Sequence, residues 1–199
     1  MRHRTSEARL FASNFLRDPY MLGSIVPSSR FLVDTVLSAV DWHRARVVVE
    51  YGPGVGTFTT EILRRMRSDA TLVVIETNCE FVKYLGSQLG DARLVLEHDS
   101  AQNLRSVLAR RGIAGADCII SGIPLGSMPK ALQVSIAVAS REALVPAGKL
   151  LVYQFTSRTL PVLRQVFRDV RRRFELRNFP PAQFFVCSNA CGGPASTNL

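Results

Sequence analysis

With 199 residues, of which 47% are hydrophobic and 21% charged, the chain is long enough for one domain with a full core and too apolar to be disordered. No stretch approaches the roughly 20 apolar residues that span a bilayer, and no secretory signal follows residues 1–7, so we expect a cytoplasmic protein. The net charge of +9 predicts an anionic partner, nucleic acid or an acidic membrane surface, unless it reflects an arginine-rich proteome.

The first forty residues are expected to form a helical cap. Residues 5–17 have an imperfect amphipathic pattern that brings Phe11 and Phe15 to one face, flanked by Arg9 and Arg17. Residues 18–27 are rich in proline and glycine and indicate a loop. A second helix is predicted to about residue 40, with Ser28 or Ser29 as its N-cap.

From residue 41 to residue 188 apolar strands alternate with helices. The strands are expected at 46–51, 71–76, 93–97, 117–121 and 149–155, with a terminal hairpin of 172–178 and 183–188. The helices are expected at about 57–68, 78–89, 101–111, 129–144 and 159–169. This alternation predicts an α/β fold with a mostly parallel seven-stranded sheet, an antiparallel terminal hairpin and helices on both faces. Residues 189–199 are small and polar, and we expect a disordered tail there.

The four cysteines do not form a metal motif. Cys187 and Cys191 have three residues between them but no second pair, and Cys118 lies in an apolar run that favours the core. We therefore expect no metal site and, in the cytosol, no disulfide.

A glycine-rich turn follows the first predicted strand. Glu50 is followed by Gly52, Gly54 and Gly56 just before a helix, and glycines there let the backbone turn tightly and approach a ligand closely. The spacing differs from that of the dinucleotide-binding fingerprint. An acid two positions before the first glycine resembles motif I of the class I S-adenosylmethionine-dependent methyltransferases, although an ordinary strand-to-helix turn would also carry glycines.

Two more acids follow the next strands. Glu76 ends the second strand, where a carboxylate can accept hydrogen bonds from ribose hydroxyls. Asp99 follows the third strand, and in the methyltransferase family an acid at this position meets the adenine amino group, with Ser100 and Ala101 beside it. Either acid alone would fit a solvated strand end. Three such acids in succession predict a site for S-adenosylmethionine in a Rossmann-like methyltransferase fold.

A loop after the fourth strand, 121–129, resembles the substrate motif of methyltransferases that act on amino nitrogens. In that motif a polar side chain and backbone carbonyls accept hydrogen bonds from the amine, so Ser121 and the carbonyl of Ile123 are the candidate catalytic groups. Leu125 stands where an aromatic residue would stack on a flat base, which argues against a nucleobase substrate. The plainer alternative is a strand-end loop before a helix with Pro129 at its first position.

Several segments together resemble the bacterial soluble-type phospholipid N-methyltransferases over roughly residues 8–187. They are 15–19, 23–30, the loop 121–129 and 178–182. The resemblance implies methylation of phosphatidylethanolamine, and possibly its methylated derivatives, toward phosphatidylcholine. It also implies peripheral attachment to the anionic inner face of the cell membrane. No nucleic acid partner is expected under this interpretation.

The resemblance also assigns roles near the N-terminus. Ser28 and Ser29 would bind the cofactor carboxylate, and Arg30 would pair with it or with a lipid phosphate, unless Arg30 is a plain surface charge. The helix 5–17 would lie in the membrane interface, or else pack on the sheet. The arginines 171–173 would add attraction to lipid headgroups, or form a solvated face.

The amine must lose a proton before it attacks the cofactor methyl group, because alkyl amines have a pKa near 10. Tyr20 is the first candidate base, with aromatic packing as its alternative role, and His98 is the second. An rRNA N6-adenine methyltransferase is the rival function, since it explains the charge and the fold equally well. A non-catalytic module that binds cofactor or lipid is a third.

Overall fold

The computed structural model describes residues 29–189. The strands are β1 (Val47–Tyr51), β2 (Thr71–Glu76), β3 (Leu94–His98), β4 (Ala116–Ser121), β5 (Leu144–Gln154), β6 (Asp169–Glu175) and β7 (Ala182–Ser188). The helices are α2 (Arg30–Leu37), α3 (Thr57–Arg65), α4 (Cys79–Gln88), α5 (Leu104–Arg110), α6 (Lys130–Ala143) and α7 (Leu160–Val166), with 3-10 turns η2 (Ala101–Asn103) and η3 (Leu125–Ser127). The N-terminal helix predicted at 5–17, with Arg9, Phe11, Phe15 and Arg17, lies outside the described residues, as do Tyr20 and Ser28.

All seven strands form one sheet in the order β3-β2-β1-β4-β5-β7-β6. Neighbouring strands from β3 to β5 are parallel, and β7 runs antiparallel between β5 and β6. This confirms the predicted sheet and its terminal hairpin. The strand order reverses between β1 and β4, and in open α/β sheets ligands bind outside the carboxyl ends of the strands at such a reversal.

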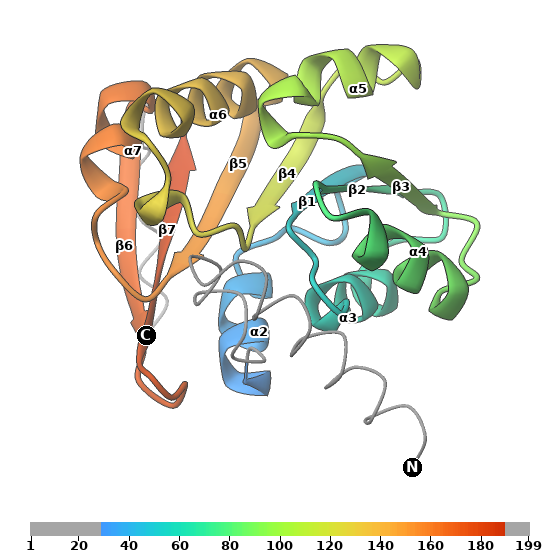
Figure 1. The fold of residues 1–199 in the computed structure, drawn as a ribbon, viewed down its shortest axis with the longest axis horizontal. Coiled ribbons are helices and arrows are strands. Elements are labelled where there is room, and N and C mark those ends of the chain that lie inside the picture. The colour runs from blue at the N-terminus through green and yellow to red at the C-terminus, as the bar shows by residue number, and fades with distance from the viewer. Residues whose placement is uncertain (1–28, 190–199) are drawn as a thin grey trace.

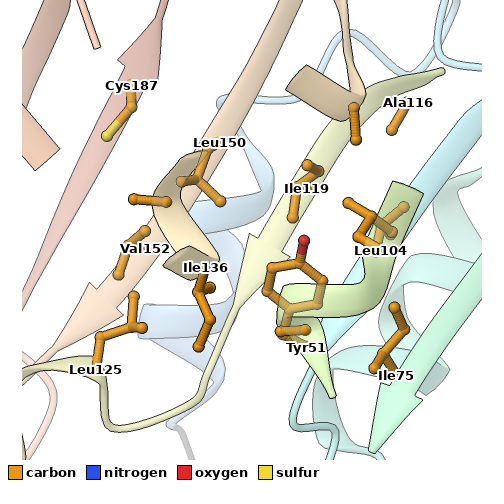
Figure 2. Close-up of a cluster of buried hydrophobic side chains, with 14 of the residues drawn as sticks. Tyr51, Ile75, Leu104, Ala116, Ile119, Leu125, Ile136, Leu150, Val152 and Cys187 are labelled. Atoms are coloured by element: carbon orange, nitrogen blue, oxygen red, sulfur yellow. The ribbon is translucent and has the colours of Figure 1, made fainter. Parts of the chain in front are cut away.

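The described helices cover both faces of the sheet (Figure 1). Helices α5, α6 and α7 bury one apolar cluster, shown in Figure 2 around Tyr51, Leu104 and Ile136. Helices α2, α3 and α4 cover the other face, where Leu32 and Phe58 are buried. Because successive strand residues point to opposite faces, strands that are buried on both sides appear as continuous apolar runs. Cys118 is buried in the second cluster, as its apolar surroundings predict.

Helix α2 belongs to this second cluster rather than to a separate body. Ser29 is its N-cap, since the Ser29 Oγ accepts a hydrogen bond from the Leu32 N–H at 3.2 Å, and this confirms one of the two predicted caps. The helix ends at Leu37, slightly earlier than expected, where the Trp42 Nε1–H donates to the Leu37 carbonyl at 3.0 Å. No helix within residues 29–189 is long and apolar enough to cross a membrane.

Two strands start earlier than the sequence predicts. Strand β5 begins at Leu144, directly after α6, and Leu144 pairs with Ala116 before a register shift. The strand passes through Gly148, where a side chain would meet the Ala116 carbonyl oxygen at 2.9 Å. Strand β6 spans Asp169–Glu175 rather than 172–178, because Glu175 and Asn178 turn toward α2 and end the strand.

Candidate functional site

The polar residues of the predicted cofactor site meet at the carboxyl ends of four neighbouring strands. Tyr51 on β1 pairs with Ile75 on β2 and with Ser121 on β4. The Asp99 N–H donates to the Glu76 carbonyl at 3.1 Å, and the Gly122 N–H donates to the Tyr51 carbonyl at 2.9 Å. These bonds join the turns after β1, β2, β3 and β4 into one continuous surface at the carboxyl ends of the strands. We call this surface the cofactor edge.

The glycine turn adopts a conformation that only glycine accepts readily. Gly52, Gly54 and Gly56 have φ of 65°, 56° and 88°, in the left-handed region. A side chain at Gly52 would come within 2.6 Å of the Ile123 Cγ2, whereas no atom of residues 29–189 lies within 4 Å of one at Gly54. The turn therefore packs against the loop after β4 on one side and leaves open space above Gly54 on the other.

Glu50 is a buried carboxyl group behind this turn. It is 2% exposed, and its Oε2 accepts a hydrogen bond from the Thr59 hydroxyl on α3 at 2.7 Å. The pKa of Glu50 is raised to about 8, chiefly by burial; the Thr59 hydrogen bond opposes this rise and the charge of Glu76 adds to it. A cationic group brought to this edge would favour the ionised form.

Glu76 lies at the end of β2, where the turn that follows stabilises its carboxylate. Its Oε1 accepts a hydrogen bond from the Asn78 N–H at 2.8 Å. Burial raises the pKa of Glu76, while the backbone N–H groups of Asn78, Thr77 and Gly54 favour the ionised form. The contribution of Gly54 shows that the glycine turn and this acid are neighbours, as a shared ligand would require.

Asp99 remains ionised beside the start of η2. Its Oδ1 accepts hydrogen bonds from the Ser100 N–H and the Asn103 Nδ2, both at 2.7 Å, and its Oδ2 pairs with Arg110 at 3.1 Å. The hydrogen bond from Asn103 is the largest of the effects that lower the pKa of Asp99. Ala101 beside it is buried, so this end of the edge offers an anionic acceptor next to an apolar surface.

Ser121 ends β4 with a buried hydroxyl group. The residue is 0% exposed, and its Oγ has no hydrogen-bond partner among the described residues. An unpaired buried hydroxyl is costly and calls for a partner beyond residues 29–189, such as a ligand.

The carbonyl of Ile123 already has a partner that sequence reasoning missed. Gln154 at the end of β5 donates from its Nε2 to this oxygen at 2.7 Å, and the Gly126 N–H approaches the Gln154 Oε1 at 3.4 Å. The Leu125 N–H also donates to this oxygen at 2.8 Å, so both lone pairs of the Ile123 carbonyl have partners within the chain and neither is left for the amine. A polar residue at the end of an otherwise apolar strand is the sequence signal that would have indicated Gln154.

An aromatic pair lies behind the same loop. The Tyr153 and Phe58 rings stack with centroids 4.5 Å apart and planes inclined by 12°. A side chain at Gly122 would come within 2.2 Å of the Tyr153 hydroxyl, so the Gly122 backbone passes close over this ring. Sequence reasoning assigned no role to either aromatic residue.

Other predicted site residues lie elsewhere or have other partners. The Leu125 side chain is buried in the core with Ile136 and Val152, so its expected place at a substrate or membrane surface is wrong (Figure 2). His98 is on β3, three strand spacings or about 14 Å from β4, and its Nε2 lies 2.9 Å from the Thr77 carbonyl. His98 is therefore remote from Ser121, where the amine is expected, and is too far away to serve as the base for that amine. Arg30 is exposed, and its guanidinium lies over the Phe31 ring at 4.9 Å.

Comparison with known proteins identifies relatives of two kinds. Residues 5–101 match the family model of ribosomal RNA adenine dimethylase. An ornithine lipid N-methyltransferase of Singulisphaera acidiphila is 32% identical over 186 residues, which cover 89% of this chain and 94% of that protein. The ribosomal RNA small subunit methyltransferase A of Laribacter hongkongensis is 33% identical over 91 residues, which cover 46% of this chain and 29% of that protein.

A similar solved structure is that of human methyltransferase-like protein 13 in complex with SAH. It superposes with a TM-score of 0.63 at 15% identity and covers 84% of this chain and 83% of that one. The fold, the cofactor edge and the related proteins together define the class of this protein. It is an enzyme, a class I S-adenosylmethionine-dependent methyltransferase. Within this class the chain belongs to the family of the Singulisphaera ornithine lipid N-methyltransferase, with which it shares nearly its whole length.

S-adenosylmethionine is the cofactor of this class, and the residues of the edge fit it. The space above Gly54 admits a ligand close to the backbone. Glu50 and Glu76 are buried carboxyl groups of the kind that a cation or a pair of hydroxyls would satisfy, and within residues 29–189 the Ser121 hydroxyl has no hydrogen-bond partner.

Proposed function

We propose that the protein methylates the amino nitrogen of a membrane lipid. The observation that supports this proposal most strongly is how much of the chain matches each of two kinds of relative. The rRNA adenine dimethylase model ends at residue 101, before β4 and the loop after it, whereas the match to the lipid N-methyltransferase covers 89% of the chain. The turns after β1, β2 and β3, which form the proposed cofactor site, lie in the first half of the chain. The loop 121–129, which is expected to contact the substrate, follows them. A lipid substrate is therefore supported by the part of the chain that distinguishes substrates.

The acceptor in this proposal is a lipid with a primary amine, either phosphatidylethanolamine or a lipid with an ornithine headgroup. Both present an alkyl ammonium beside an apolar anchor. The loop Ser121–Pro129 contains no aromatic residue, and Leu125 is buried, so the loop has no ring on which a nucleobase would stack. A compact alkyl amine needs only hydrogen-bond acceptors there.

In this proposal, different residues of the cofactor edge bind different parts of the cofactor. Glu76 would accept bonds from the ribose hydroxyls and Asp99 from the adenine amino group. Glu50 would neutralise the charged methionine end, near Ser28 and Ser29. The full proposed binding set is Ser28, Ser29, Glu50, Gly52, Gly54, Gly56, Glu76, Asp99, Ser100, Ala101 and Ser121.

The protein's contribution to the reaction is position and desolvation. S-adenosylmethionine supplies a methyl group on a positively charged sulfur. Ser121 orients the amine nitrogen toward that methyl group, and the Ile123 carbonyl, which accepts hydrogen bonds from the Leu125 N–H and from Gln154, fixes the loop beside it. Removal of the lipid ammonium from water lowers its pKa and favours the neutral, nucleophilic amine. Tyr20 remains the proposed acceptor of the proton, with water as the alternative.

The test is transfer of labelled methyl from S-adenosylmethionine to three acceptors in parallel. These are vesicles with phosphatidylethanolamine, vesicles with ornithine lipid, and purified rRNA. We expect label in lipid, reduced about tenfold or more by Ser121→Ala through the loss of one oriented hydrogen bond. Ser106→Ala on the exposed side of α5 is the matched control and should act as the wild type. Label in rRNA alone would overturn the proposal in favour of adenine methylation.

A further inference from the structure

The turn between β6 and β7 presents three large apolar side chains to solvent. Phe174, Leu176 and Phe179 are 57%, 75% and 90% exposed, and among residues 29–189 they are the large hydrophobic residues exposed in this way. An apolar group of this size on the surface of a folded domain usually marks an interaction site. We call this segment, residues 174–180, the hairpin tip.

Two polar residues of the hairpin tip, Glu175 and Asn178, face inward, whereas Arg177 is exposed. Asn178 is 1% exposed, and its Oδ1 accepts a hydrogen bond from the Ser29 N–H at 3.0 Å while its Nδ2 donates to the Pro180 carbonyl at 2.7 Å. Glu175 is 4% exposed and accepts a hydrogen bond from the Thr35 hydroxyl at 2.6 Å. The tip is therefore fixed to α2 through two buried polar side chains, while its large apolar side chains lie outside, the reverse of an ordinary surface turn.

Arginines flank the hairpin tip on both faces of β6. Arg172 lies over the Phe174 ring at 4.4 Å, and Arg173 points to the opposite face because side chains alternate along a strand. Both are exposed, and neither has an ion-pair partner within residues 29–189. The one acid of the tip, Glu175, is neutralised by Arg177 at 2.9 Å. The surface around the apolar group is therefore positively charged.

The hairpin tip lies on the same side of the molecule as the cofactor edge. Strand β6 is antiparallel to β7, which is antiparallel to β5, so β6 ends at the edge where β1 to β5 also end. In Figure 1 the turn between β6 and β7 extends beyond the sheet at that edge, next to α2. A surface held against the tip would face the loop after β4 as well.

We propose that the hairpin tip docks the enzyme on an anionic lipid bilayer. Phe174, Leu176 and Phe179 enter the boundary between headgroups and acyl chains, and Arg172 and Arg173 contact lipid phosphates. This rests on the proposed function, because it supplies the surface from which the amino lipid is taken. A second copy of the chain is a poorer occupant, since a two-fold contact through the tip brings like-charged arginines together.

The experiment measures binding of the full chain to sedimented vesicles of phosphatidylcholine with and without phosphatidylglycerol. One variant replaces Phe174, Leu176 and Phe179 with serine, which keeps the charge. A second carries Arg172→Glu and Arg173→Glu. Its matched control carries Arg44→Glu and Arg168→Glu, the same change in charge before β1 and β6, at the opposite edge of the sheet. We expect both tip variants to bind anionic vesicles about tenfold more weakly or worse, and the control to lose less than about threefold.

Two further measurements separate this proposal from the proposed function. Methylation of an amino lipid with chains too short to form bilayers should be unchanged in the tip variants, because the cofactor edge is untouched. If the wild type binds vesicles through the tip but methylates no lipid, the function fails and the docking surface stands. Unchanged vesicle binding by both tip variants would overturn the docking surface. A wild-type dimer that the serine variant converts to monomer, with vesicle binding unchanged, would also overturn it and assign the tip to self-association.

Discussion

Gln154 on β5 donates a hydrogen bond from its Nε2 to the backbone carbonyl of Ile123, 2.7 Å away in the loop after β4. Gln154 is 8% exposed, so the bond is shielded from water. It fixes the loop that follows Ser121, the residue that would orient the amine. Gln154 is therefore a positioning residue, and it acts through Ile123 on the shape of the substrate loop.

Gln154→Ala should separate catalysis from cofactor binding. We expect kcat to fall about tenfold, because a displaced substrate loop no longer holds the amine in line with the methyl group, while the Kd for S-adenosylmethionine changes less than about threefold. Loss of one buried hydrogen bond should also lower the free energy of unfolding by about 1 kcal/mol. Gln165→Ala on the exposed side of α7 is the control. Equal losses in kcat and in cofactor affinity would refute a role confined to the substrate loop.

The raised pKa of Glu50 predicts how the stability of the cofactor-free protein depends on pH. In the unfolded chain a glutamate titrates near 4.3, whereas burial raises the pKa of Glu50 to about 8 in the folded protein. Between these values the folded state holds a proton that the unfolded state has lost. The free energy of unfolding should therefore fall as pH rises from about 5 to about 8, by at most about 1.4 kcal/mol per pH unit for one proton. Urea unfolding should show this decline, and Glu50→Gln should reduce its slope.

The same group should couple cofactor binding to proton release. S-adenosylmethionine carries a cationic sulfonium and an ammonium group, and both favour ionised Glu50. Binding near pH 7 should then release a proton, so the heat of binding should differ between buffers of low and high ionisation enthalpy. Glu50→Gln should remove most of that difference. Identical heats for the wild type in both buffers would mean that Glu50 does not change its protonation on binding.

Gly52 and Gly54 differ in what a side chain would meet, although both have positive φ. At Gly52 the added carbon lies 2.6 Å from the Ile123 Cγ2, and at Gly54 it meets nothing within 4 Å. Gly52→Ala should therefore destabilise the protein by about 1–2 kcal/mol more than Gly54→Ala does. Adding Ile123→Ala should recover part of that excess, as measured by urea unfolding of the four variants of the cycle. Strictly additive effects would show that the two residues are not in contact.

The sequence was sufficient to predict the sheet and the cofactor edge. Val48, Val74 and Ile120 lie in runs that are apolar on both faces, a pattern typical of central parallel strands, and the acids and glycines follow those runs directly. Residues near each other in sequence thus carry the signal. Gln154 and Ile123 are 31 positions apart, and nothing local to either residue predicts their hydrogen bond.

The direction of a side chain at an edge strand was also beyond sequence reasoning. Phe174 and Leu176 alternate with Glu175, a pattern that predicts a buried apolar face and a solvated acid. The structure reverses this, because Thr35 and Arg177 hold Glu175 inside. The buried position of Leu125 was missed for a similar reason, since a loop leucine can close the core or face a ligand.

Mass spectrometry of cellular lipids tests the central claim most directly. The protein would be expressed in a bacterium that makes phosphatidylethanolamine but no methylated lipid, with and without added ornithine lipid synthesis. We predict lipids that carry one or more additional methyl groups on the headgroup nitrogen, absent from cells that express Ser121→Ala at equal level. Unchanged amino lipids together with newly methylated rRNA adenines, in cells that express the wild-type protein, would contradict the account.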